Sequence, residues 1–138
     1  MKISTRGRYG LRLLVDIAEQ ATEAPIALSA IAKRQNLSEK YLQQVALLLA
    51  RGGVLTSVKG SGGGYSLAKR PEEILMYNVL DLLEGNIAFE EEPPANETAV
   101  QQVIRHHFYR AVDRNVRTAF GELNLADVMK ADWFGYEI

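Results

Sequence analysis

The sequence predicts a mainly α-helical protein with a small β-hairpin: a winged helix-turn-helix followed by a long C-terminal dimerisation helix. Three observations predict this class. Two short amphipathic segments joined by a tight turn precede a glycine-rich hairpin, and a much longer amphipathic segment follows. The chain has 138 residues, 47% of them hydrophobic, which is enough for one core.

The first helix is expected to begin at Ser4 or Thr5, because both side chains can cap a helix N-terminus. Its apolar residues recur at helical spacing at Leu11, Leu14, Val15 and Ala18. Ala24-Pro25 interrupts the pattern, since proline lacks a backbone N–H donor.

Two helices at 29–35 and 38–51, with a tight turn at Gln35-Asn36, indicate a helix-turn-helix. The second helix of this motif reads base edges with its N-terminal residues, and glutamine and lysine suit adenine and guanine or phosphate. An ordinary helical hairpin with a solvated face is the alternative. The candidate DNA contacts are Ser38, Lys40, Tyr41, Gln43 and Gln44.

The glycine-rich segment 59–64 lies between two strands, 54–58 and 65–67, and predicts a wing. A wing lysine can enter a minor groove, and glycines let the backbone approach the duplex. A plain flexible hairpin tip and a nucleotide-binding loop are alternatives, although no Gly-Lys-Ser/Thr ending is present. The candidate contacts are Lys59, Gly60, Gly62 and Gly63.

A short helix at 75–83, ended by Gly85, precedes an acidic, proline-rich loop at 85–96. Asn96 is expected to cap a long helix that runs to about Glu122, with Asn124 capping a last short helix. The apolar stripe of the long helix consists of Val100, Val103, Ile104, Phe108, Ala111, Val112, Val116, Ala119 and Phe120.

The other elements offer little to cover so long a stripe, so we expect a homodimer that pairs this helix. Such a dimer would present two recognition helices about 34–36 Å apart, on successive major-groove faces. The chain is accordingly divided into a DNA-binding domain at 1–84, the acidic loop at 85–96, and a dimerisation helix with tail at 97–138.

The charges are distributed unevenly. Residues 1–70 carry 11 basic and 4 acidic side chains, whereas residues 71–138 carry 5 and 13. A basic first half is typical of a polyanion-binding domain, and it makes Arg6 and Arg8 further candidate DNA contacts. Chance asymmetry between two solvated surfaces remains open on charge alone.

Several classes of chemistry are not expected. The chain has no cysteine, which excludes disulfides and thiolate-bound metals. His106 and His107 point about 100° apart on a helix, so we expect no shared metal and place His107 in the core or an interface. No nucleophile–base pair is visible, so we expect no enzyme and no cofactor. Without a signal peptide or apolar span, a cytoplasmic protein is expected.

Three segments, KISTRGRYGL, LSAIAKRQNLSEKYLQQV and SVKGSGGGYSLAK, strongly resemble the Rrf2 family of winged-helix repressors. The resemblance covers nearly the whole chain. It implies a dimer crossed through the long helix that binds an imperfect palindrome in double-stranded DNA near a promoter. By position, Ser38, Tyr41, Gln43 and Gln44 would contact DNA from the recognition helix, and Lys59 with its glycines from the wing.

The sequence departs from cluster-binding members of the family. Those members place three cysteines in the stretch that matches the acidic loop and the start of the long helix, where this chain has Glu90-Glu91-Glu92-Pro93-Pro94. We therefore expect no iron–sulfur cluster. The iron–sulfur regulator also has glutamate at the position of Gln43 and arginine at that of Lys59, so its operator preference does not transfer.

The acidic loop and aromatic tail instead resemble the branch of the family that represses cysteine metabolism. That resemblance implies control by cysteine synthase (O-acetylserine thiol-lyase), whose active site accepts peptide tails ending in isoleucine. Tyr136 and Ile138 are the candidate partner-binding residues, and a tail folded on its own dimer through Trp133 and Phe134 is the alternative. The alternative function is a protein-interaction module or a metabolite-sensing regulator whose winged domain binds a partner.

Overall fold

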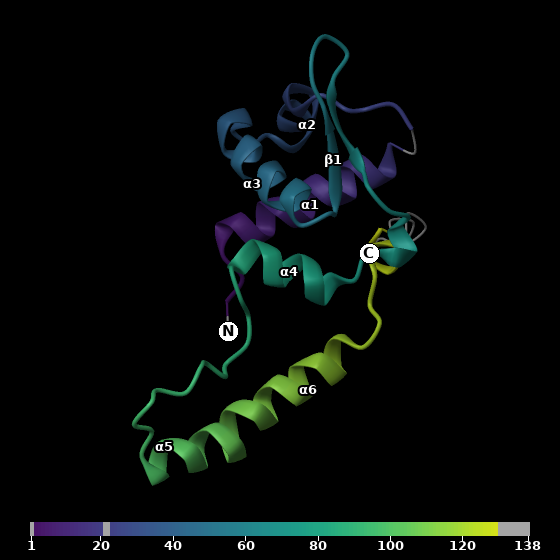
Figure 1. The fold of residues 1–138 in the computed structure, drawn as a ribbon. Helices are drawn as coiled ribbons and strands as arrows, with labels where there is room; N and C mark the ends of the chain where they lie inside the picture. The colour runs from purple at the N-terminus through teal and green to yellow at the C-terminus, as the bar shows by residue number, and fades with distance from the viewer. Residues whose placement is uncertain (1, 21–22, 130–138) are drawn as a thin grey trace.

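The computed structural model describes residues 2–20 and 23–129 and divides into a head and a long helix (Figure 1). The structure confirms the predicted class. The head contains α1 (Thr5–Glu19), α2 (Leu28–Gln35), α3 (Glu39–Arg51), β1 (Leu55–Val58), β2 (Gly64–Leu67), the 3₁₀ turn η1 (Pro71–Glu73), α4 (Met76–Glu84) and the returning α7 (Leu125–Val128). The long helix consists of α5 (Ala99–Ile104), a π-helical turn (Arg105–Tyr109) and α6 (Arg110–Phe120).

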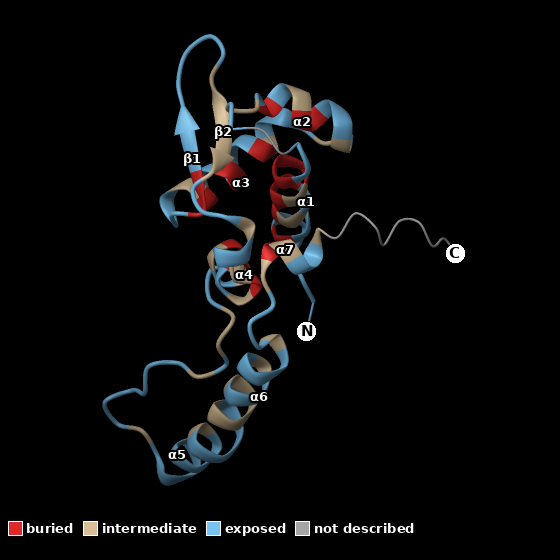
Figure 2. Cartoon of the chain, turned by 90° about the vertical axis from the view of Figure 1, so that its right-hand side faces the viewer, coloured by how far each residue is buried: buried red, intermediate tan, exposed pale blue. Residues whose placement is uncertain are grey.

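The hydrophobic core lies entirely in the head, around α1 (Figure 2). Ser4 caps α1 as predicted, its hydroxyl oxygen accepting from the N–H of Gly7 at 3.0 Å. Glycines let α1 approach α4 closely: a β-carbon on Gly10 would lie 2.5 Å from a methyl group of Leu83. The fully buried large side chains are Leu13, Leu14, Ile31, Leu42, Val45, Leu49, Val79, Leu83 and Leu125.

The two helices of the predicted helix-turn-helix are present. Helix α2 begins one residue before the expected start, with Ala27 at the N-cap position and no side-chain cap. Asn36 adopts the left-handed conformation at φ 55°, which turns the chain sharply toward α3. Ser38 caps α3 as predicted, accepting from the N–H of Tyr41 at 3.3 Å.

The wing is an antiparallel hairpin in which Leu55 pairs with Leu67 and Val58 with Gly64. A short bridge adds the segment before α2 to this hairpin: Ile26 and Tyr65 exchange backbone hydrogen bonds of 2.8 and 2.9 Å. Gly64 permits the approach, because a β-carbon there would lie 2.2 Å from the carbonyl oxygen of Ile26. The wing is therefore fixed to the segment before α2 close to its glycine-rich tip.

The long helix differs from its prediction at both ends. Thr98, not Asn96, is its N-cap, and Gln101 bonds back to the Thr98 N–H in a capping box. The helix stops at Phe120 because Gly121 takes up φ 54° and ψ −127°, which favours glycine. It spans about 33 Å at 1.5 Å per residue. His107 is exposed rather than in the core of its own chain, as is His106.

After the long helix the chain returns to the head. Leu125 is fully buried there, and Asn124 caps α7 as predicted, bonding the N–H of Asp127 at 3.0 Å. The core of the head therefore includes a residue from the segment that the sequence assigned to dimerisation. In the part of the chain that the structure describes, no helix is long and apolar enough to cross a membrane.

Candidate nucleic-acid interface

The first turns of α3 present polar side chains to solvent. Ser38, Lys40, Gln43 and Gln44 are exposed. Tyr41 is half-buried, and its ring packs edge-to-face against that of Tyr9, with centroids 5.4 Å apart. These exposed groups surround the positive end of a helix dipole, where anions such as phosphate are favoured.

A buried carboxylate holds the turn of the helix-turn-helix in place. The side chain of Asp16 on α1 is only 2% exposed. It accepts hydrogen bonds from Arg34 at 2.7 and 3.1 Å and from the Gln35 amide at 2.8 Å. The hydrogen bonds to Asp16 raise the pKa of Arg34. The sequence analysis missed this clamp, although an aspartate inside the apolar stripe of α1 was the available signal.

Arg12 strengthens the same connection. Its guanidinium donates to the backbone carbonyl of Gln35, at the end of α2, and lies 5.6 Å from the ring centroid of Tyr9. Tyr9 is in turn the ring that contacts Tyr41. Side chains of α1 thus contact both helices of the motif, and they position the recognition helix relative to the head.

The tip of the wing has the geometry that its glycines allow. Gly60 and Gly62 have φ values of 93° and 76°, and the Gly63 N–H donates to the Gly60 carbonyl at 3.0 Å. A β-carbon on Gly63 would lie 2.2 Å from the backbone oxygen of Val58. Lys59 is exposed at this tip. The helix-turn-helix and the wing occupy the end of the molecule opposite the long helix (Figure 1).

The arginines at the start of α1 bond to their own chain. Arg6 donates to the carbonyl of Leu83 in the last turn of α4 at 2.5 Å, and Arg8 donates to the carbonyl of Ile3 at 3.2 Å. These contacts tie both side chains to α4 and the N-terminal segment rather than to α3. Each guanidinium keeps further N–H donors, so contact with phosphate stays a prediction for both.

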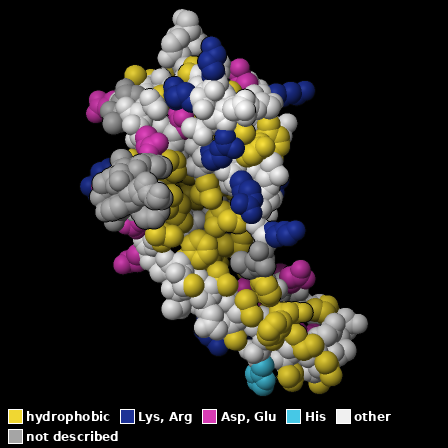
Figure 3. Space-filling view, turned by 180° about the vertical axis from the view of Figure 1, so that it is seen from behind, with side chains coloured by type: hydrophobic (Ala, Val, Ile, Leu, Met, Phe, Trp, Pro, Cys, Tyr) yellow, Lys and Arg dark blue, Asp and Glu magenta, His cyan; other side chains and the backbone are white. Residues whose placement is uncertain are grey.

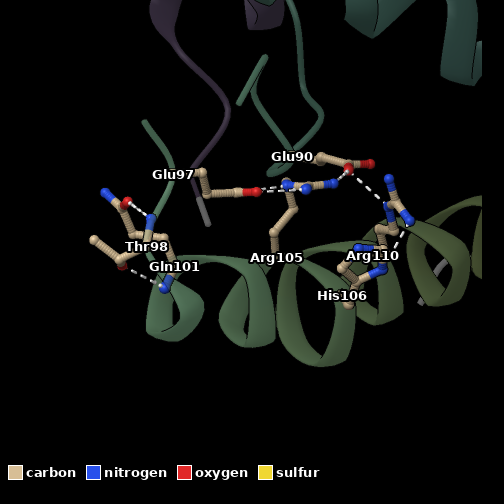
Figure 4. A network of polar contacts seen from close by, with 7 residues as sticks. All are labelled: Glu90, Glu97, Thr98, Gln101, Arg105, His106 and Arg110. Atoms are coloured by element: carbon tan, nitrogen blue, oxygen red, sulfur yellow. Dashed lines mark hydrogen bonds and ion pairs between the residues drawn. The ribbon is translucent and has the colours of Figure 1, made fainter. Parts of the chain in front are cut away.

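The acidic loop is attached to the long helix by ion pairs (Figure 4). Arg105 bonds both carboxylate oxygens of Glu97 at 2.7 Å, and Glu90 accepts from Arg105 at 3.3 Å and Arg110 at 2.6 Å. The π-turn, in which the Arg110 N–H bonds the Arg105 carbonyl, lets both arginines reach the loop. The hydrogen bonds from these arginines lower the pKa of Glu90 and of Glu97.

Backbone groups of the loop are held as well. The carboxylate of Asp113 accepts the N–H groups of Phe89 at 2.7 Å and Glu90 at 3.1 Å. The loop carboxylates nearest the helix are thus neutralised by arginines. Among residues 2–20 and 23–129, no three histidine, aspartate or glutamate side chains are grouped so that they could hold a metal ion. Tyr136 and Ile138 lie outside the described residues.

Comparison with known proteins relates this chain to a family of transcriptional regulators. The profile of the Rrf2 family, described as iron-dependent transcriptional regulators, matches residues 3–131. The chain belongs to the Rrf2 family. The HTH-type regulator CymR of Bacillus subtilis is 41% identical over 99 residues, covering 69% of this chain and 72% of CymR. This chain is therefore a DNA-binding transcriptional regulator, and its relatives are regulators rather than enzymes.

Solved structures of relatives agree with this fold. That of CymR, called the global cysteine regulator of B. subtilis, has a TM-score of 0.72 at 34% identity, covering 94% of this chain and 96% of CymR. That of IscR from T. potens has a TM-score of 0.72 at 30% identity, covering 100% and 93% of the two chains. Both structural matches include the long helix, so this chain shares the winged head and the long helix with CymR and IscR.

The family is described as iron-dependent, but the residues present in this chain do not fit a thiolate-ligated iron site. The whole sequence contains no cysteine. Glu90 and Glu97, the loop carboxylates that lie against the long helix, are already paired with arginines. The chain's two histidines, His106 and His107, are exposed on the long helix, and His106 bonds Arg110 through its Nδ1 atom at 2.9 Å.

Proposed function

We propose that this chain is a homodimeric repressor that binds an imperfect DNA palindrome without an iron–sulfur cluster. One observation carries the proposal: the polar first turn of α3 and the wing with Lys59 are exposed on the same head. Most of this head comes from residues 1–70, the strongly basic half of the sequence. Ser38, Lys40, Tyr41, Gln43 and Gln44 would enter the major groove. Lys59 and the tip glycines would contact the adjacent minor groove and its phosphates.

The apolar surface of the long helix supports dimerisation. Large apolar side chains on it are exposed to the following extents: Val100 68%, Val103 53%, Ile104 40% and Phe108 55%. Hydrophobic side chains gather at its far end and also between helix and head (Figure 3). A cavity of about 500 Å³ lies beside the latter, lined in part by Ile3, Leu80, Phe89 and Phe120. A two-fold pair of long helices would remove this surface from water.

DNA binding is tested with duplexes selected from a random-sequence library, because the operator is unknown. We expect Lys59→Ala to weaken binding to every selected duplex. It should also reduce the slope of log K against log salt concentration by about 2, since each protomer of the dimer loses one phosphate contact. Gln44→Ala should change the preferred base at one position of each half-site. Arg114→Ala, at the opposite end of the molecule, removes the same charge and serves as the control. Small, equal effects of all three changes on every duplex would contradict the groove assignment.

The dimer is tested by Phe108→Asp, which places a charge in the exposed apolar stripe. Sedimentation should show a dimer for the unaltered chain and a monomer for this variant, with loss of palindrome binding. Asn115→Asp introduces the same charge at another exposed position of the long helix and should leave the dimer intact. A variant Phe108→Asp that sediments as a dimer would exclude this surface as the interface.

We also propose that this chain regulates cysteine metabolism, a role supported by its likeness to CymR, the global cysteine regulator of B. subtilis. We further propose that cysteine synthase controls it through the C-terminal Tyr136 and Ile138. Deletion of Ile138 should then abolish co-elution with cysteine synthase and leave DNA binding unchanged. Unaltered co-elution would show that the tail is not the contact. The competing function, a winged domain that binds protein instead of DNA, would give duplex affinity that is negligible even at low salt.

A further inference from the structure

The long helix meets the head at an aromatic junction made by three side chains. Tyr77 lies in the first turn of α4. The ring of Phe120, the last residue of α6, meets the Tyr77 ring edge-to-face, with centroids 5.5 Å apart and planes at 90°. The guanidinium of Arg117 lies 4.5 Å from the Tyr77 ring centroid. Both contacts are attractive, because the ring face carries negative and the ring edge positive partial charge.

Backbone hydrogen bonds fix the same junction from the other side. After Gly121 ends the helix, the Leu123 carbonyl accepts from the Met76 N–H at 2.9 Å, and the Leu125 N–H donates to the Ile74 carbonyl at 2.9 Å. Met76 is the neighbour of Tyr77 in the chain. The end of the long helix is therefore held both by ring contacts to α4 and by a backbone bridge directly before it.

Helix α4 also contacts the recognition helix. Gly52, the C-cap of α3, lies so close to α4 that a β-carbon there would be 2.4 Å from a methyl group of Leu82. Helix α4 thus lies between α3 and the long helix and contacts both of them (Figure 2). In a dimer paired through the long helices, the contacts of α4 with α3 and with the long helix would determine how the two recognition helices are placed relative to each other.

We propose that the junction of Tyr77, Arg117 and Phe120 determines which spacing between DNA half-sites the dimer accepts. This inference rests on the proposed homodimeric repressor. One inserted base pair moves the second half-site by about 3.4 Å and rotates it by about 35°, so a stiff dimer fits one spacing and a loose dimer fits several. None of the three side chains needs to touch DNA to have this effect.

The test compares variants of the full chain in selection from a random-sequence duplex library, followed by sequencing. Tyr77→Leu and Arg117→Ala remove ring contacts. Tyr77→Phe keeps them, and Arg114→Ala removes an arginine whose side chain makes no ion pair or ring contact within the described ranges. The unaltered chain and both controls should select one spacing, whereas the two junction variants should also select neighbouring spacings.

Titration of the selected duplex, and of the same duplex with one central base pair added, gives the size of the effect. Arg117→Ala should lower the discrimination between these duplexes about fivefold, because each protomer loses one ring contact. Tyr77→Leu should lower it at least as much, because each protomer loses two. Arg117 is exposed, so Arg117→Ala keeps the head folded even if Tyr77→Leu does not.

Two other outcomes separate the inference from the function on which it rests. If the unaltered chain selects paired half-sites, and both junction variants keep its spacing and its discrimination, the inference is overturned and the dimeric repressor stands. If the unaltered chain selects single, unpaired sites or no duplex at all, the homodimeric repressor is overturned and the spacing role with it.

Discussion

The most informative single residue of the head is Asp16, because its carboxylate is buried and serves three donors at the helix-turn-helix. A sequence pattern assigns residues to apolar or polar faces, and it places this aspartate on the apolar face of α1. The partners Arg34 and Gln35 are 18 and 19 residues away. Spacing rules cannot pair residues at that separation, so the clamp became visible only in the structure.

Asp16→Asn should destabilise the head by about 2 kcal/mol, because a buried amide cannot accept all three hydrogen bonds and one of its donors is left facing another donor. The free energy of unfolding from urea titration measures this loss. Glu19→Gln, an exposed carboxylate three residues along the same helix, should change it by less than about 0.5 kcal/mol. Equal effects of both substitutions would show that the clamp contributes nothing.

The candidate contact residues were predictable to different degrees. Ser38 was recognised as a cap, and the exposure of Lys40, Gln43 and Gln44 follows from helical periodicity. The glycines of the wing tip were recognised by composition. Their structural requirement is stronger than the sequence suggested for Gly63 and Gly64, where backbone atoms leave no space for a β-carbon.

Among the elements, the long helix shows most clearly where sequence patterns succeed and fail. Its apolar stripe predicted its existence and exposure. Its start was misplaced by two residues, because both Asn96 and Thr98 are good caps and only the capping box with Gln101 distinguishes them. The π-turn at Arg105–Tyr109 was not predicted, and Arg105 and Arg110 pair with a loop that has no periodicity of its own.

The ion pairs of the acidic loop predict a loss of stability in acid. Arg105 lowers the pKa of Glu97, so the charged carboxylate stabilises the folded state above its ordinary pKa of 4.5, and this contribution is lost as pH falls through the lower folded value. The thermal midpoint of the unaltered chain should therefore exceed that of Glu97→Gln at pH 7, and the difference should shrink as the pH is lowered below 4.5.

Glu91→Gln provides the matched control for this titration. Glu91 lies in the same loop and makes no ion pair within residues 2–20 and 23–129, so its replacement should leave the midpoint unchanged at every pH. A difference between the unaltered chain and Glu97→Gln that persists undiminished at pH 3 would contradict the electrostatic explanation. Added salt at pH 7 should narrow the difference in the same direction as acid.

At the scale of the whole molecule, the head and the long helix are joined by more than a linker. The predicted division at 97 follows the change in composition, and the long helix does begin close to it. However, α7 packs into the head, and its Leu125 is a core residue. Long-range packing of this kind cannot be read from local periodicity, because a four-residue helix carries too short a pattern.

Leu125→Ala should destabilise the head by about 2–5 kcal/mol through the cavity that it leaves, although the residue lies beyond the long helix in the chain. Urea unfolding monitored by circular dichroism would measure the change. Leu123→Ala removes the same atoms two residues earlier, where the side chain is 43% exposed, and should cost far less. If the two substitutions cost the same, α7 does not belong to the core of the head in solution.

The π-turn carries a consequence for tolerance to length change. Deleting one residue between Arg105 and Arg110 would restore ordinary α-helical hydrogen bonding there, and the two arginines, then four residues apart, would stay on one face of the helix. Glu90 could then still accept from both arginines. A deletion elsewhere in the long helix would instead rotate its two ends by about 100° relative to each other, so the π-turn is the place where this helix should best tolerate the loss of one residue.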